Sequence, residues 1–208
     1  MKKLLLLFIL SLGAISSVNA SSIKGAFGYS LGDVEVIEGW HSTFNRITNI
    51  SKQFKPYRPL PGFKRYYIHV TLNENKIYSI RASTYEDEKL YERSCYDSKI
   101  IDSALKLLQS KYGRFKLIYN QRVEVEYTAA VLFGGVREYK GIEESRRWEF
   151  NDGNRSINLS CYKSLKLGQA FSLELEYIDN DLYKLFKEEN RIKNGESQPI
   201  NLNTTPEI

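Results

Sequence analysis

The chain has 208 residues, a formal net charge of +5 at pH 7, 42% hydrophobic and 13% aromatic residues, and two cysteines. This length suits one domain of ordinary size with a sizeable core. The mild positive charge falls well short of the basic surface that nucleic-acid binding requires, so we expect no nucleic-acid partner.

Residues 1–20 have the parts of a secretory signal peptide. Lys2 and Lys3 supply the positive start, Leu4 to Leu10 form an apolar stretch, and Ala20 is the small residue needed at the cleavage site. A membrane-spanning helix needs roughly 20 apolar residues, which neither this stretch nor any later one provides. An uncleaved N-terminal anchor is the alternative. We expect a soluble mature protein that begins near Ser21 and is periplasmic or secreted.

The first part of the mature chain predicts little regular structure. Residues 21–32 are small and glycine-rich, which is typical of an entry segment, and residues 34–50 fit a short helix or an irregular strand. Residues 54–63 (FKPYRPLPGF) contain three prolines. Because proline fixes φ and lacks an N–H, this segment is predicted to be a rigid, extended connection.

The same connection is a candidate recognition surface. Aromatic and positively charged side chains are interspersed along it, and a stiff segment loses little conformational entropy on binding. The alternative is that the aromatic residues anchor the loop to the core while the cations face solvent. The predicted binding residues are Tyr57, Arg58, Phe63, Lys64 and Arg65.

An antiparallel hairpin is predicted next. Apolar residues recur at every second position over 65–72 and 76–82, with a turn at 73–75 between the two runs. In the second run Tyr78, Ile80 and Ala82 are predicted to share the buried face. His69 lies on the face opposite Ile68 and is predicted to be exposed.

The clearest helix is predicted over residues 97–112. Asp97 or Ser98 can cap its start, and Gly113 suits its end. The residues with the spacing of one buried helical face are Ile101, Leu105, Leu108 and Tyr112.

The second half is predicted to form mainly strands. Apolar residues alternate over 122–127, 146–150, 156–164 and 171–177, and turn sequences at 151–154 and 167–169 join the last three into a meander. The run 129–136 (AAVLFGGV) is predicted to be a buried strand that leads into a turn. The alternative is an exposed loop on which Leu132 and Phe133 bind a partner.

The chain is predicted to end in a helix and a tail. Residues 181–191 have a helical pattern that Asp179 or Asn180 can cap, and the polar residues from 194 onward are predicted to be disordered. The predicted organisation is a signal peptide (1–20), a single domain (21–193) and a tail (194–208). Its fold class is α+β, with an antiparallel sheet of about six strands, a hairpin plus a meander, packed against one main helix and followed by a C-terminal helix.

Cys95 and Cys161 are predicted to form a disulfide, because an even number of cysteines in an oxidising compartment is typical of a cross-link. Two buried free thiols are the alternative. A cross-link over this separation would stabilise the domain by roughly 4 kcal/mol.

The sequence contains none of the common catalytic or cofactor motifs. There is no HExxH, P-loop, GxGxxG or CxxC, and two histidines are too few for a His-rich metal site. Gly28 to Gly32 (GYSLG) matches the nucleophile-elbow pattern by letter, but no core strand precedes it. His41 is only a nominal general base. We expect no catalytic residue, no metal and no cofactor.

Short landmarks in the chain resemble known proteins. They are Phe27-Gly28, Leu31-Gly32, Tyr78-Ser79-Ile80 and the helix end Leu108-Gln109-Ser110-Lys111-Tyr112-Gly113. Their layout resembles that of small exported proteins of Gram-negative bacteria. More distantly it is similar to the two-layer α/β units of BamE-like and β-lactamase-inhibitor-like proteins. The resemblance implies an exported domain of the cell envelope and assigns no functional residue.

These observations favour an exported, non-catalytic binding protein that recognises a protein or cell-envelope partner, in the manner of an inhibitor or immunity protein. One alternative is an envelope hydrolase that uses carboxylates, which would bring two acidic side chains together in a cleft and raise the pKa of one. The other is a structural envelope component with a large apolar patch.

Overall fold

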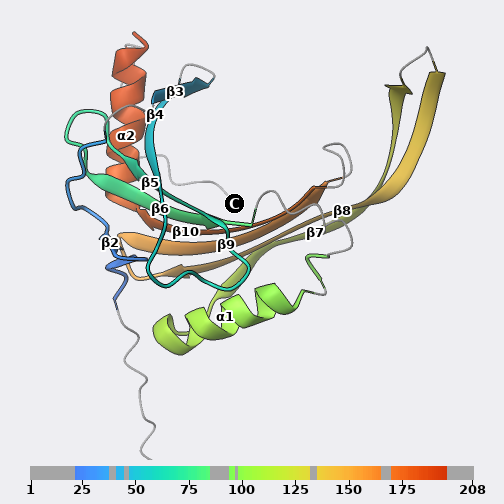
Figure 1. Cartoon of the computed structure of the whole chain (residues 1–208), viewed down its shortest axis with the longest axis horizontal. Helices are drawn as coiled ribbons and strands as arrows, with labels where there is room; N and C mark the ends of the chain where they lie inside the picture. Colours follow the sequence, from blue (N-terminus) through green and yellow to red (C-terminus); the bar gives the residue numbers. More distant parts are fainter. Residues whose placement is uncertain are drawn as a thin grey trace, which may run out of the picture.

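The computed structural model describes residues 22–37, 41–44, 47–84, 94–96, 98–131, 135–164 and 170–195. In these residues the chain forms a two-stranded ribbon, a large antiparallel sheet and two helices (Figure 1). The predicted signal peptide, Leu132, Phe133, the turn at 167–169 and the tail from residue 196 lie outside the described residues. Neither of the helices described is long and apolar enough to cross a membrane.

The large sheet has eight strands, arranged as two four-stranded meanders. The first contains β3 (His41–Phe44), β4 (Ile47–Phe54), β5 (Arg65–Val70) and β6 (Ile77–Ser83). The second contains β7 (Lys116–Val131), β8 (Gly135–Asn151), β9 (Arg155–Ser164) and β10 (Ala170–Asp179). The last strand of each meander pairs with the other in the centre, which gives the order β3-β4-β5-β6-β10-β9-β8-β7.

The sheet is wider than predicted. The α+β class, the antiparallel sheet and the two helices are confirmed, but the sheet has eight strands and not about six. The two additional strands are β3 and β4. The prediction left a short helix or an irregular strand open over residues 34–50, because polar residues such as Asn49 and Lys52 interrupt the apolar pattern in this region. The predicted hairpin is β5–β6, and the predicted meander is β8–β9–β10 with β7 as its outer neighbour.

Helix α1 (Lys99–Tyr112) covers one face of the sheet and completes the core. Its buried residues are Ile101, Ala104, Leu108 and Tyr112, which pack with fully buried strand residues such as Ile80 and Leu159. Three of the four predicted face residues are therefore buried, and the fourth, Leu105, is half-buried. The helix ends at Gly113, whose φ of 103° favours glycine.

The N-terminal segment forms a small ribbon of β1 (Gly25–Ala26) and β2 (Tyr29–Ser30). Phe27 and Gly28 make its turn with positive φ, and the Phe27 ring lies 4.9 Å from the Tyr66 ring in the core. The described residues that follow Ser30, 31–37, form no helix. The GYSLG sequence therefore consists of the second strand of the ribbon with a turn residue before it and a turn after it, and the helix that a nucleophile elbow requires does not follow in residues 31–37.

The predicted disulfide is confirmed. Cys95 and Cys161 are bonded, with their Cα atoms 5.7 Å apart, and join the segment before α1 to β9. The fully buried Glu144 accepts a hydrogen bond from the Cys95 backbone N–H at 2.7 Å, and Arg146 Nη1 donates to the Cys95 carbonyl at 3.0 Å. The cross-link therefore lies in a closed network of polar contacts at the border of the core.

The sheet is strongly curved, and α1 lies against its convex face (Figure 1). At one side of the concave face stand α2 (Asn180–Lys193) and the β3–β4 pair, and at the other rises the β7–β8 hairpin. Among the described residues, β9 pairs with residues 144–151 of β8, and residues 135–143 of β8 with their partners on β7 extend beyond this pairing as a two-stranded arm. The concave face therefore lies between two raised sides.

Candidate binding site

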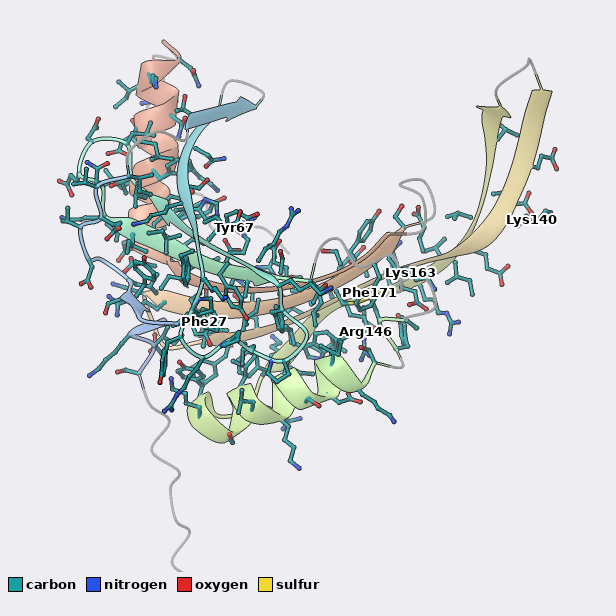
Figure 2. All side chains as sticks on the ribbon, viewed as in Figure 1. Phe27, Tyr67, Lys140, Arg146, Lys163 and Phe171 are labelled. Atoms are coloured by element: carbon teal, nitrogen blue, oxygen red, sulfur yellow. A yellow bond between two sulfur atoms is a disulfide. The ribbon has the colours of Figure 1, made fainter. Side chains whose placement is uncertain are left out.

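The concave face is formed by the alternate residues of the strands that build the core. Because successive side chains of a strand point to opposite faces, the neighbours of Ile68, Ile80 and Leu175 lie here. Figure 2 shows Tyr67 on this side of the sheet and Arg146 on the side of α1. The central row is largely polar and consists of Tyr67, His69, Ser79, Arg81, Glu174, Glu176, Asn158 and Arg147.

Arg81 on β6 is the electrostatic centre of this row. Its Nε lies 3.3 Å from Glu174 Oε1, and its Nη2 donates to Glu176 Oε1 at 3.0 Å. Ser79 Oγ donates to the same Glu176 oxygen at 2.7 Å. Burial by itself lowers the pKa of Arg81, but the two carboxylates outweigh it and raise that pKa. Ion pairs thus reinforce the central pairing of β6 with β10.

The His69 side chain on β5 is half-buried, whereas the sequence predicted an exposed position. Both ring nitrogens are shielded from solvent and have no hydrogen-bond partner among the described residues. Burial, followed by the charge of Arg81, lowers the pKa of His69 from 6.5 to about 4. At pH 7 the ring is therefore neutral, with one nitrogen that can donate a hydrogen bond and one that can accept.

A β-bulge places the Tyr78 ring beside His69 on the concave face. The register between β5 and β6 shifts between His69 and Val70, which leaves Tyr78 without a partner in the ladder. The Tyr78 side chain therefore turns onto the concave face, where its ring stacks on Phe186 at 4.6 Å and its hydroxyl donates to Asn49 Oδ1 at 3.3 Å. The prediction that Tyr78 shares the core face with Ile80 is wrong.

Helix α2 forms the wall above this part of the sheet. It starts directly after β10, where Asp179 Oδ1 accepts a hydrogen bond from the Leu182 N–H at 3.2 Å, so the predicted cap is confirmed. Near its end, Glu189 accepts hydrogen bonds at 2.6 and 3.2 Å from two backbone N–H groups at the β5–β6 turn. Asn190 Oδ1 accepts one from the Thr48 N–H at 2.7 Å. Both ends of the helix are thus fixed to the sheet.

A pocket of about 490 Å³ lies between α2 and the concave face, within the size range of small-molecule sites. It is lined by Asn49, His69, Tyr78, Arg81, Arg147, Glu176, Ile178, Tyr183, Phe186, Lys187 and Asn190. Two of its cations have no carboxylate partner among the described residues. Arg147 donates to Asn158 Oδ1 at 3.3 Å, and Lys187 Nζ lies 4.4 Å above the Tyr183 ring.

A second surface lies on the other side of the concave face, near the base of the arm. We call it the tyrosine band: Tyr119 (47% exposed), Val123 (39%) and Tyr162 (44%). They pair with alternate residues of β8, so all three share the face of Arg147. A hollow of about 140 Å³ lies beside Val123 and Tyr162. This surface combines exposed aromatic side chains with a neighbouring arginine.

The predicted recognition loop is divided by the structure. Tyr57 is 93% exposed, with the Arg58 guanidinium 6.0 Å from its ring centre, whereas Phe63 is 5% exposed and anchors the loop to the core. Lys64 is exposed beside Phe63 at a hollow of about 510 Å³, and Arg65 is half-buried at the start of β5. Of the five predicted binding residues, Tyr57 and Arg58 form an exposed aromatic and cationic pair. Their role in binding stays a prediction.

The residues of the pocket were not selected from the sequence. The available indication was that His69, Arg81 and Glu176 each fall on the polar face of a predicted strand. Pairing of β6 with β10 and packing of α2 bring them together, and neither is visible in local periodicity. For metals, the described part of the chain holds no group of three or more His, Cys, Asp or Glu residues that could bind an ion.

Comparison of the chain with protein-family models, with curated proteins and with solved structures finds no match. The resemblance to small exported proteins and to BamE-like units therefore stays a prediction. Function has to be inferred from the geometry of the concave face.

Proposed function

We propose that this chain is an exported binding protein that acts without catalysis and recognises a protein partner of the cell envelope through the tyrosine band. The observation that carries the proposal is the exposure of two tyrosines and a valine on one face, beside Arg147. Tyrosine and arginine are enriched at the centres of protein interfaces, where they contribute most of the binding energy.

The shape of the molecule supports this proposal. The tyrosine band lies at the base of the arm, where the pairing of β9 with β8 ends, so a partner seated there would contact both the sheet and the arm. An isolated pair of strands is only marginally stable in water, and a partner packed against the arm would stabilise it. The Cys95–Cys161 disulfide fits the oxidising compartment that export implies.

A second candidate function, hydrolysis by paired carboxylates, is favoured by one observation. Glu174 and Glu176 lie on the same face of β10, and burial raises the pKa of Glu174. Both carboxylates, however, contact Arg81, and Glu176 also accepts a hydrogen bond from Ser79. This arrangement fits a structural ion network better than an acid and base that face a substrate.

Affinity capture from a cell-envelope extract tests the binding function. The baits are the oxidised protein, a Tyr119→Ala/Tyr162→Ala variant and a Tyr57→Ala/Arg58→Ala variant of the predicted recognition loop. We expect one protein to be retained by the native bait and the loop variant and lost by the band variant. Loss only with the loop variant would move the site to that loop. Retention of no protein by any bait would overturn the proposal.

The same preparations test the second candidate function. Incubation of the native protein with peptidoglycan and with envelope glycans, followed by chromatography of the products, should show no turnover. Turnover that disappears in Glu176→Gln but persists in the tyrosine-band variant would establish hydrolysis in place of binding.

A further inference from the structure

The pocket under α2 adjoins the tyrosine band at Arg147 but contains none of the band's own residues, and it has the character of a small-molecule site. It extends over β4, β5, β6 and β10 below the helix and reaches Arg147 on β8. The hydrogen bonds of Glu189 and Asn190 hold α2 in place, so the pocket is formed before any ligand enters. Small-molecule sites are typically preformed hollows in which a few polar groups converge on an apolar wall.

The polar groups of the pocket include a donor and an acceptor that lack partners. Buried polar atoms in proteins are nearly always hydrogen-bonded, yet neither His69 nitrogen has a partner among the described residues. Arg81 does not lack partners as His69 does, because Glu174 and Glu176 balance its charge. His69 lines the pocket and is the neutral side chain there whose hydrogen-bonding capacity the described residues leave unused.

The charges at the rim favour an anion. Arg147 uses only its Nε, toward Asn158, among the described residues, so both Nη groups are left for a ligand. Lys187 interacts with the Tyr183 ring and has no carboxylate partner in the described part of the chain. Guanidinium and ammonium groups bind carboxylates, phosphates and sulfonates through charge-assisted hydrogen bonds.

The aromatic wall of the pocket favours a ligand with a flat ring system. Tyr78 stacks on Phe186, and the Tyr183 ring lies 5.7 Å from the Tyr78 ring. Tyr183 is part of α2 and remains partly exposed at the rim. Stacked aromatic rings bind other rings through their faces.

We propose that this pocket binds a small organic anion with a flat, aromatic body, its acidic group between Arg147 and Lys187, its ring along Tyr183, and a polar group at His69. The ligand is a separate molecule from the partner of the tyrosine band, and the site goes beyond the proposed function.

Two fluorescent probes with the same ring system test the proposal. Anilinonaphthalene sulfonate carries an acidic group, and phenylnaphthylamine lacks it. We expect the sulfonate to bind the native, oxidised protein at one saturable site, and the neutral probe to bind more weakly. In Arg147→Gln/Lys187→Gln the affinity for the sulfonate should fall by roughly tenfold or more, with little change for the neutral probe. Tyr183→Ala should weaken both.

The matched control is Lys99→Gln/Lys106→Gln, which removes the same charge from exposed positions of α1 on the convex face and should leave both affinities unchanged. Circular dichroism and urea unfolding of each variant establish that it is folded. Equal affinity of the two probes, or sulfonate affinity unaffected by Arg147→Gln/Lys187→Gln, would overturn the proposal. The residues replaced in the band variant of the capture experiment, Tyr119 and Tyr162, do not line the pocket, so failure of one proposal can be distinguished from failure of the other.

Discussion

The convex and concave faces of the sheet are built from alternate residues of the same strands, but they are stabilised differently. On the convex face, α1 and the disulfide close an apolar core in which Ile80, Leu159 and Leu175 are fully buried. On the concave face, Arg81 is paired with two glutamates, and α2 covers only one side. Stability therefore depends mainly on the convex face, and the chemistry available for binding is concentrated on the concave one.

The largest effect is expected from removal of the disulfide. Cys95→Ala/Cys161→Ala should lower the free energy of unfolding by about 4 kcal/mol, because the bond restricts the unfolded chain over a separation of 66 residues. Urea unfolding followed by circular dichroism measures the loss. Reduction of the native protein should cause a similar shift. An unchanged midpoint in the variant would show that the convex face is stable without its cross-link.

A pair of neighbouring substitutions on β9 compares the two faces directly. Leu159→Ala should destabilise by about 3 kcal/mol, because it leaves a cavity in the core. Ser160→Ala, on the concave side of the same strand, should change stability by less than about 0.5 kcal/mol. Thermal and urea unfolding measure both. Losses of equal size would contradict the division of roles between the faces.

The concave face should make stability depend on pH through His69. Its pKa is about 4 in the folded protein, against an ordinary 6.5, so between these values the unfolded chain binds the additional proton. Stability should therefore fall by about 2 kcal/mol as the pH drops from 6.5 to 5, and this loss should stop below the folded pKa of about 4.

Urea unfolding at several pH values measures this slope in the native protein and in His69→Gln. Arg81 and Glu176 face the imidazole and are present in both proteins, so the difference between the two slopes belongs to His69. Identical slopes would mean that the ring is solvated in the folded protein.

The smallest effect compares the caps of the two covering helices. Asp179→Ala should destabilise by about 1 kcal/mol, because Asp179 accepts a hydrogen bond at the start of α2 and pairs with Arg155. Ser98→Ala, at the equivalent position of α1, should be close to neutral, since the Ser98 hydroxyl makes no capping hydrogen bond. Thermal unfolding separates the two cases. A larger loss of stability for Ser98→Ala than for Asp179→Ala would contradict this expectation.

Local patterns in the sequence predicted the convex face better than the concave one. Short-range rules predicted the buried positions: period-two alternation for Ile68 and Ile80 on their two strands, and helical spacing for Ile101 and Leu108. Simple redox chemistry predicted the cysteine pair. These residues become buried whichever element packs on them, so their burial could be predicted without knowing which element that is.

The concave site could not be predicted in the same way. His69 lines a pocket whose other wall is α2, which begins more than one hundred residues later in the chain. Tyr78 faces this site because of a β-bulge, which a regular alternation of side chains between two faces cannot predict. The Arg81–Glu176 pair depends on which strand lies beside β6. Each of these is a long-range property of the fold.

The central pairing of β6 with β10 also has a consequence for the order of folding. Each meander consists of neighbouring strands that can pair as soon as they are made, but Arg81 and Glu176 across the central pair are 95 residues apart. Closure of so long a loop is slow, so we expect this junction to form last. Until β10 is in place, β6 presents a row of unpaired N–H and C=O groups, the kind of edge from which aggregation starts.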